Sequence, residues 1–131
     1  MSLQTIPIND YITLTIGDAL KNIHSTKYRM IYFDPPFNSD RIYKLSEDDD
    51  LGFTDKWTDM EYRGFIREHI DKLYDLLEDD GTLFFHISSS CMYIPETILR
   101  DKFKYVEPIF WKKCRSKNNV KHKLGSVVDI I

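Results

Sequence analysis

The 131-residue chain fits one domain and has the apolar material for a core, since 42% of its residues are hydrophobic and 14% are aromatic. This composition excludes disorder as the default state, and a formal net charge of −3 excludes a generally basic nucleic-acid binder. Two cysteines are too few for a disulfide scaffold, and no apolar run reaches the ~18 residues of a membrane span. We therefore expect a protein of the reducing, intracellular (cytoplasmic) compartment.

Charge is unevenly distributed along the chain. Acidic residues gather in the middle, at Glu47, Asp48, Asp49, Asp50, Asp55, Asp59 and Glu61. Basic residues gather in the last third, at Lys102, Lys104, Lys112, Lys113, Arg115, Lys117, Lys121 and Lys123. Residues 112–126 are therefore predicted to form a basic, flexible loop that either contacts the phosphates of a nucleic acid or is only solvated.

The N-terminal part predicts one strand and one helix start. Residues 1–10 contain Pro7 and are expected to be irregular or loosely paired. Residues 11–16 alternate β-branched and aromatic side chains, which predicts a strand that ends at Gly17. Asp18 then stands where a helix N-cap belongs.

Residues 30–33 form a short apolar, aromatic run that is typical of a fully buried strand in a parallel sheet. Pro35 and Pro36 must end it, because they lack amide hydrogens and fix φ. Asp34 and the carbonyl of Pro35 would then form a rigid pair of acceptors for a planar amino group, beside the flat ring of Phe37. The alternative is a buried strand that leaves through a rigid turn, with Asp34 bonding to nearby amides.

The rest of the chain alternates predicted helices and strands. Residues 40–57 show no sustained period and are predicted to be a long loop, either functional or a solvated insert. A helix is predicted over residues 58–77, with His69 as a packing or surface residue. A turn at Asp79-Asp80-Gly81, where Gly81 would tolerate a positive φ, leads to a buried strand over residues 82–87. A helix over 93–103, a strand over 103–111 and a final apolar strand over 127–131 with an unpaired edge complete the prediction.

Asp34-Pro35-Pro36-Phe37-Asn38-Ser39 after a buried strand closely resembles the catalytic motif of amino-group DNA methyltransferases, which make N6-methyladenine or N4-methylcytosine from S-adenosyl-L-methionine. The continuation is most similar to the β-order branch, which includes type III restriction-modification methylases. The resemblance implies an α/β fold with a Rossmann-like, mostly parallel sheet and helices on both faces. It also implies base flipping, DNA as partner and no metal.

Further site residues follow from the same resemblance. The catalytic residues would be Asp34, Pro35, Pro36 and Phe37. The cofactor would contact Asp18, Asp34, His86 and Ser88, although Asp18 as a plain N-cap and His86 as a satisfied strand-end histidine remain open. Substrate contacts would come from Asn38, Ser39, Tyr43, Trp57, Lys112, Lys113, Arg115 and Lys117. Adenine is favoured over cytosine, although both present an amino group to the same acceptors.

One element of the family pattern is missing from the sequence. The chain has glycines at positions 17, 52, 64, 81 and 125 and never as Gly-x-Gly, so the glycine-rich cofactor loop of these enzymes is absent. Residues 1–131 are therefore expected to be the catalytic half of a methyltransferase domain, cut short, split from a second chain, or degenerate. The alternatives are a non-catalytic remnant or accessory nucleic-acid-binding subunit and, ranked lower, an RNA guanine-N2 methyltransferase.

Overall fold

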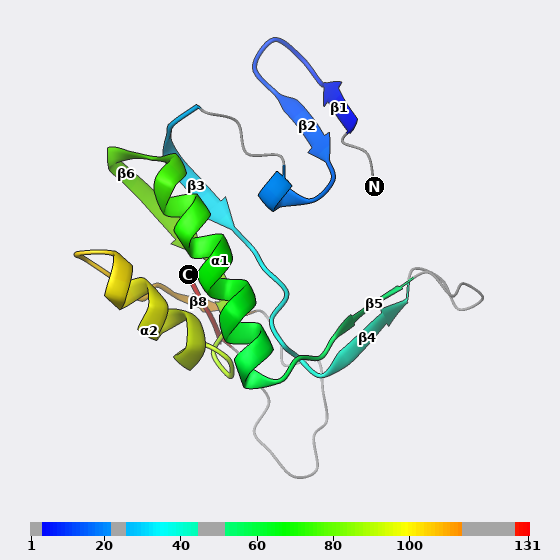
Figure 1. Cartoon of the computed structure of the whole chain (residues 1–131), viewed down its shortest axis with the longest axis vertical. Coiled ribbons are helices and arrows are strands. Elements are labelled where there is room, and N and C mark those ends of the chain that lie inside the picture. The colour runs from blue at the N-terminus through cyan, green and yellow to red at the C-terminus, as the bar shows by residue number, and fades with distance from the viewer. Residues whose placement is uncertain (1–3, 22–25, 45–51, 114–127) are drawn as a thin grey trace.

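The computed structural model describes residues 4–21, 26–44, 52–113 and 128–131, which form a mixed α/β structure (Figure 1). In chain order its elements are β1 (Gln4–Pro7), β2 (Thr13–Ile16), the 3-10 helix η1 (Ala19–Lys21), β3 (Tyr28–Phe33), β4 (Arg41–Lys44), β5 (Gly52–Asp55), α1 (Asp59–Leu76), β6 (Leu77–Phe85), β7 (Ile87–Ser88), α2 (Tyr93–Lys102), β8 (Phe110–Lys112) and β9 (Val128–Ile130). The acidic residues 47–50 and the basic residues 114–126 lie outside the described part.

Strands β3 and β6 form the parallel pair that positions the site, with Phe33 opposite Phe85 at their carboxyl ends. Only His86 separates β6 from β7, and β7 belongs to a second sheet with the antiparallel order β7-β9-β8. In the described residues the parallel part is thus two strands wide. The α/β class is confirmed, whereas the wider parallel sheet that the resemblance implied is not seen here.

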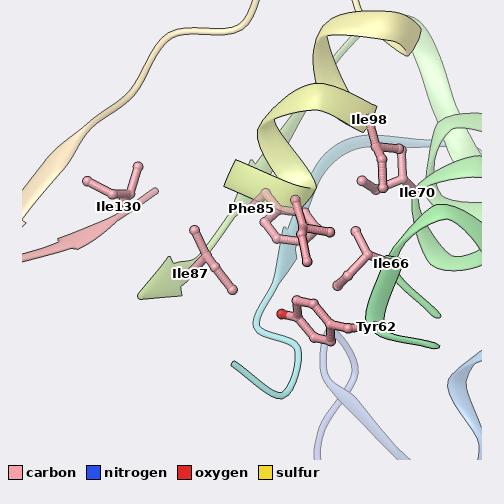
Figure 2. Close-up of a cluster of buried hydrophobic side chains, with 8 residues drawn as sticks. Tyr62, Ile66, Ile70, Phe85, Ile87, Ile98 and Ile130 are labelled. Carbon is pink, nitrogen blue, oxygen red and sulfur yellow. The ribbon is translucent and has the colours of Figure 1, made fainter. Parts of the chain in front are cut away.

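Both helices cover the same face of β3 and β6. Their buried side chains meet those of β6, β7 and β9 in one core cluster (Figure 2), made of Tyr62, Ile66, Ile70, Phe85, Ile87, Ile94, Ile98 and Ile130. Phe33 packs against this cluster, but Met30 and Tyr32 of the same strand are 65% and 51% exposed. The expectations of a fully buried β3 and of helices on both faces are therefore wrong for the described residues, because only one face is covered.

The first helix forms as its sequence predicts. Thr58 caps α1 by accepting a hydrogen bond from the Glu61 amide, and the Glu61 carboxylate accepts one from the Thr58 amide at 2.9 Å. This capping box satisfies two amide donors that a helix start otherwise leaves unpaired. Tyr62, Ile66 and Ile70 follow at four-residue spacing and are fully buried, so the apolar stripe faces the core. Helix α2 likewise forms as expected, with Pro95 in its first turn.

Two segments form hairpins, although the sequence predicted no strand in the first beyond loose pairing and a loop in the second. Residues 4–7 pair antiparallel with β2, and β4 pairs antiparallel with β5 inside the predicted loop 40–57. The second hairpin is held by a stacked aromatic pair, Tyr43 and Phe53, with ring centroids 4.9 Å apart. In Figure 1 both hairpins extend away from the two long helices. Cross-strand pairing overrides the weak alternation of these segments.

The predicted turn at residues 79–81 lies inside β6. Tyr28 is opposite Leu77 and Met30 is opposite Thr82, so residues 78–81 bulge out of the ladder. Gly81 is needed for close approach rather than for positive φ, because a Cβ there would lie 2.9 Å from the Tyr28 carbonyl oxygen. The predicted turn is therefore wrong, and the positive φ that Gly81 could tolerate is not adopted.

The C-terminal strands differ from the expected pattern at both ends. Pairing of residue 109 with Ile131 begins only after Pro108, which has no amide hydrogen, so β8 covers Phe110–Lys112 instead of residues 103–111. The final strand β9 lies between β7 and β8, and the expectation that it has a free edge is wrong. Within the described ranges, no helix has the length and apolar character to cross a membrane.

Candidate active site

The candidate site lies where β3 and β6 end next to each other. Asp34 follows β3 directly, and His86 follows β6. The backbone amide of His86 donates to the carbonyl of Phe33 at 2.9 Å, which extends the parallel ladder by one bond. The carboxyl edge of parallel strands is the usual binding edge in α/β sheets. The Asp34 side chain is 55% exposed there, so its oxygens are open to a ligand.

The imidazole of His86 connects two carboxylates from different strands. Its Nδ1 lies 3.2 Å from Oδ1 of Asp34 and 2.9 Å from the hydroxyl of Tyr32. Its Nε2 lies 3.5 Å from Oδ2 of Asp129, which comes from β9. With a side chain only 18% exposed, the ring is held from both sides.

Asp129 and Tyr32 belong to this site, and sequence reasoning missed both. Asp129 is 8% exposed, and its Oδ1 lies 2.6 Å from Nζ of Lys113. The sequence signal was an isolated acid within the apolar run of residues 127–131, since buried charges are normally paired. Partial burial of the hydroxyl, together with the negative charges of Asp34 and Asp129, raises the pKa of Tyr32. Tyr32 therefore stays a neutral hydroxyl that can donate or accept.

The segment after the motif is fixed by a buried carboxylate. Asp55, at 2% exposure, accepts the backbone amides of Asn38 at 2.9 Å and Ser39 at 3.0 Å and the Ser39 hydroxyl at 2.6 Å. The side-chain carbonyl of Asn38 accepts the amide of Trp57 at 2.9 Å. Asn38 has φ 54°, a left-handed conformation that asparagine tolerates better than most residues. Asn38 and Ser39 thus use their polar groups to shape the loop.

Two further contacts hold the loop from the helix side. The buried hydroxyl of Tyr62 donates to the carbonyl of Pro36 at 2.7 Å, and the Cys91 thiol lies 3.8 Å from the carbonyl of Asn38. Burial is the main cause that raises the pKa of Tyr62, with Cys91 and Asp55 as smaller contributors. The carbonyl of Pro36 therefore already has an internal donor. Among the contacts described above, none gives the Pro35 carbonyl an internal donor.

Two further aromatic side chains, Phe37 and Trp111, contact the His86 ring. Phe37 is partly buried against the core cluster and meets the His86 ring edge-on, at 5.2 Å between centroids. Trp111 of β8, which the sequence analysis did not assign, is 57% exposed and lies parallel to the same imidazole at 6.4 Å. Phe37 thus has one side in the protein and one near the site, as a stacking residue requires.

The other expected substrate residues are not gathered at this point. Tyr43 is on the β4–β5 hairpin, where its hydroxyl lies 3.3 Å from the Ser39 hydroxyl. Trp57 packs on Phe65 of α1, with its buried indole nitrogen unpaired. Lys112 is exposed on β8, whereas Lys113 is engaged with Asp129. Arg115 and Lys117 lie outside the described residues.

Asp18 and Ser88, which were expected to contact the cofactor, make local contacts in the structure. Asp18 caps η1 through the Leu20 amide and pairs with Lys21, which lowers its pKa. Ser88 bonds to the Ser90 hydroxyl at 3.0 Å. An open groove of about 750 Å³ runs between α2 and β6, but neither these residues nor Asp34 line it. The residues expected to contact the cofactor are therefore not gathered around this groove.

His69 is a packing residue, as the sequence predicted. Its Nδ1 lies 2.8 Å from the Phe65 carbonyl oxygen, and its ring stacks on Phe33 at 5.4 Å. Across the described residues, no cluster of three or more histidine, cysteine or acidic side chains is placed to hold a metal ion.

Comparison with known proteins identifies the family. A family model described as DNA methylase (N6_N4_Mtase) matches residues 28–131, which include β3, the Asp34 loop and Asp129. The chain is also 27% identical over 112 residues to the type II methyltransferase M.EcaI from Enterobacter cloacae, with 83% of this chain and 25% of that protein covered. It thus spans a quarter of that relative's length. Since the family model matches well over half of the chain, the protein belongs to the N6/N4 family of DNA methylases.

Proposed function

We propose that this chain carries the base-binding half of a DNA methyltransferase that methylates the exocyclic amino group of adenine or cytosine. The observation that carries the proposal is the exposed Asp34 carboxylate followed by Pro35, on a loop that Asp55, Tyr62 and Trp57 hold in one conformation. Membership of the DNA methylase family supports it.

The chain's own residues bind and orient the amino group. A carboxylate oxygen of Asp34 and the carbonyl of Pro35 each accept one of its two hydrogens, which turns the nitrogen lone pair away from both oxygens. Phe37 packs on one face of the base, which has to be flipped out of the duplex to reach the loop. S-adenosyl-L-methionine, when bound, supplies a methyl group already activated as a sulfonium. Positioning therefore accounts for most of the work asked of this loop.

The proposal includes a second part that holds the cofactor. No Gly-x-Gly loop exists in the sequence, and Asp18 and Ser88 are occupied by local contacts. We assign the cofactor pocket to a further segment or chain that completes a Rossmann-like sheet at β3, whose second edge is unpaired in the described residues. Residues 112–126 would add phosphate contacts, with Lys112 as the exposed cation among those described.

The test is methyl transfer to DNA by the complete protein that carries this chain. We expect the Asp34→Ala variant to lose methylation while its urea unfolding curve stays that of the wild type, because Asp34 is exposed. Asp40→Asn is the control, since Asp40 is an exposed acid six residues away whose partner is Lys56, and asparagine tolerates its φ of 58°. Nucleoside analysis of the product distinguishes N6-methyladenine from N4-methylcytosine.

Three outcomes would contradict the proposal. Wild-type turnover by Asp34→Ala would remove Asp34 from the reaction. A wild-type protein that binds DNA but neither binds the cofactor nor transfers methyl would be an accessory subunit. Methylation of guanine-N2 in RNA with no activity on DNA would identify the lower-ranked enzyme class.

A further inference from the structure

We propose that His86 is a positioning residue that holds the Asp34 carboxylate through Nδ1, and that Asp129 and Lys113 hold the imidazole from its other side. The proposal rests on the methyltransferase function above, in which Asp34 receives the amino group. It gives His86 a role other than the cofactor contact that the sequence suggested.

Four charged or titratable side chains lie in a row that ends at Asp34. Lys113, Asp129, His86 and Asp34 follow one another with separations of 2.6, 3.5 and 3.2 Å between their nearest nitrogen and oxygen atoms. They come from the end of β8, from β9, from the junction of β6 and β7, and from the end of β3. Basic and acidic groups alternate, so every contact is attractive when His86 carries a proton on the nitrogen concerned.

The Asp34 side chain needs a partner if it is to keep one rotamer. An aspartate that is 55% exposed has side-chain rotamers available to it unless a directional partner selects one. Among the ion pairs between described residues, the partner of Asp34 is His86. The imidazole itself is fixed, because Nε2 faces the buried Asp129 and the backbone amide is bonded to Phe33. A fixed imidazole thus lies against a carboxylate that is otherwise free to move.

The partners of the His86 ring nitrogens favour positioning of Asp34 over contact with a cofactor. Both ring nitrogens of His86 are within 3.5 Å of protein oxygens, and Tyr32 adds a further oxygen at 2.9 Å from Nδ1. Phe37 faces the ring edge-on. The polar atoms that would bind a cofactor are therefore already occupied by side chains of this chain.

Two amide variants of His86 test the proposal, because each keeps one nitrogen. The amide nitrogen of asparagine falls near the place of Nδ1, and that of glutamine falls near the place of Nε2. We expect His86→Gln to lower kcat roughly ten- to hundredfold without a change in KM or in cofactor affinity. We expect His86→Asn to retain most of the activity. His69→Gln is the control for the loss of a packed imidazole that does not contact Asp34.

A measurement that needs no activity tests the contact itself. His86→Gln keeps the Asp129 contact and loses the Asp34 contact, together with its contacts to Tyr32, Phe37 and Trp111. The shift of the urea midpoint that it causes should therefore be smaller in a protein that already carries Asp34→Asn. Equal shifts in the wild-type and Asp34→Asn backgrounds would overturn the contact, whatever the enzyme does.

The kinetic outcomes separate the two proposals. Equal kcat values for the wild type, His86→Gln and His86→Asn would refute positioning by His86 and leave the methyltransferase proposal intact. Weaker cofactor binding in both variants would show that His86 contacts the cofactor. A wild type that never transfers methyl would refute the proposed function, while the urea experiment would still decide whether His86 holds Asp34.

Discussion

The two faces of the β3–β6 pair are built from the same strands and differ in almost every other respect. On one face, Phe33 and Phe85 pack under α1 and α2. On the other, Tyr32 and Met30 are exposed, and Asp34 and His86 follow at the strand ends. Alternation along a strand thus places stability on one side and polar chemistry on the other. Substitutions on the two faces should therefore separate loss of fold from loss of activity.

The largest effect on stability is expected from the covered face. Ile70 is fully buried in the core cluster, so Ile70→Ala should lower the free energy of unfolding by roughly 2–5 kcal/mol through lost burial and the cavity left behind. Met30→Ala on the open face is the control, and its urea midpoint should stay close to the wild type. Similar losses for both variants would show that the two faces are not energetically distinct.

The next effect concerns the buried carboxylate beneath the open site. Asp55→Ala leaves the amides of Asn38 and Ser39 and the Ser39 hydroxyl without their acceptor. We expect a loss of about 2–3 kcal/mol in unfolding free energy, together with a lower kcat. Asp40→Asn is the control, because Asp40 is an exposed acid in the same segment. An equally large loss of unfolding free energy in Asp40→Asn would argue against a special role for Asp55.

Removal of the Tyr62 hydroxyl should have a smaller effect on stability. Tyr62→Phe deletes the donor to the Pro36 carbonyl and should lower the free energy of unfolding by about 1–2 kcal/mol. Burial raises the folded-state pKa of Tyr62 above its ordinary value of 10.0. The contribution of the neutral Tyr62 hydroxyl to the free energy of unfolding is therefore fully present below pH 10. It is lost as the pH rises further. Between pH 9 and 11 the free energy of unfolding should therefore decrease more steeply with pH for the wild type than for Tyr62→Phe.

The smallest of these effects is expected at the start of α1. Thr58→Ala removes the cap and should lower the free energy of unfolding by about 1 kcal/mol, whereas Thr58→Ser keeps the hydroxyl. Hydrogen bonds from Thr58 lower the pKa of Glu61, so the cap is complete above the ordinary value of 4.5 and weakens as the pH falls through the lowered pKa. Circular dichroism at pH 3 and pH 7 measures this, and equal helix loss in both variants would exclude the side-chain cap.

Local patterns predicted the elements whose own residues show a clear period or a clear end. The aromatic run before Pro35 and Pro36 predicted β3 and the loop, and the apolar spacing after Thr58 predicted α1. The hairpin of β4 and β5 was missed, because its stability comes from pairing across residues 45–51 rather than from alternation. The bulge in β6 was read as a turn, since Asp79-Asp80-Gly81 has turn residues in a segment that a ladder holds extended.

The candidate site was predicted only as far as its motif. Asp34 is exposed at the end of β3, as expected. Its link to His86, and from there to Asp129, joins residues that are far apart in the sequence and brings together strands of two different sheets. Such contacts depend on tertiary pairing, and residue spacing alone contains no information about them.

The position of His86 between β6 and β7 has a mechanical consequence. Its main chain continues the parallel ladder with β3, while its side chain contacts Asp129 of β9. This one residue therefore links the parallel β3–β6 sheet to the antiparallel β7-β9-β8 sheet. A slip of β9 by one residue would turn Asp129 toward the helices and leave the imidazole without its anchor. The position of the imidazole beside Asp34 thus depends on the register of β9.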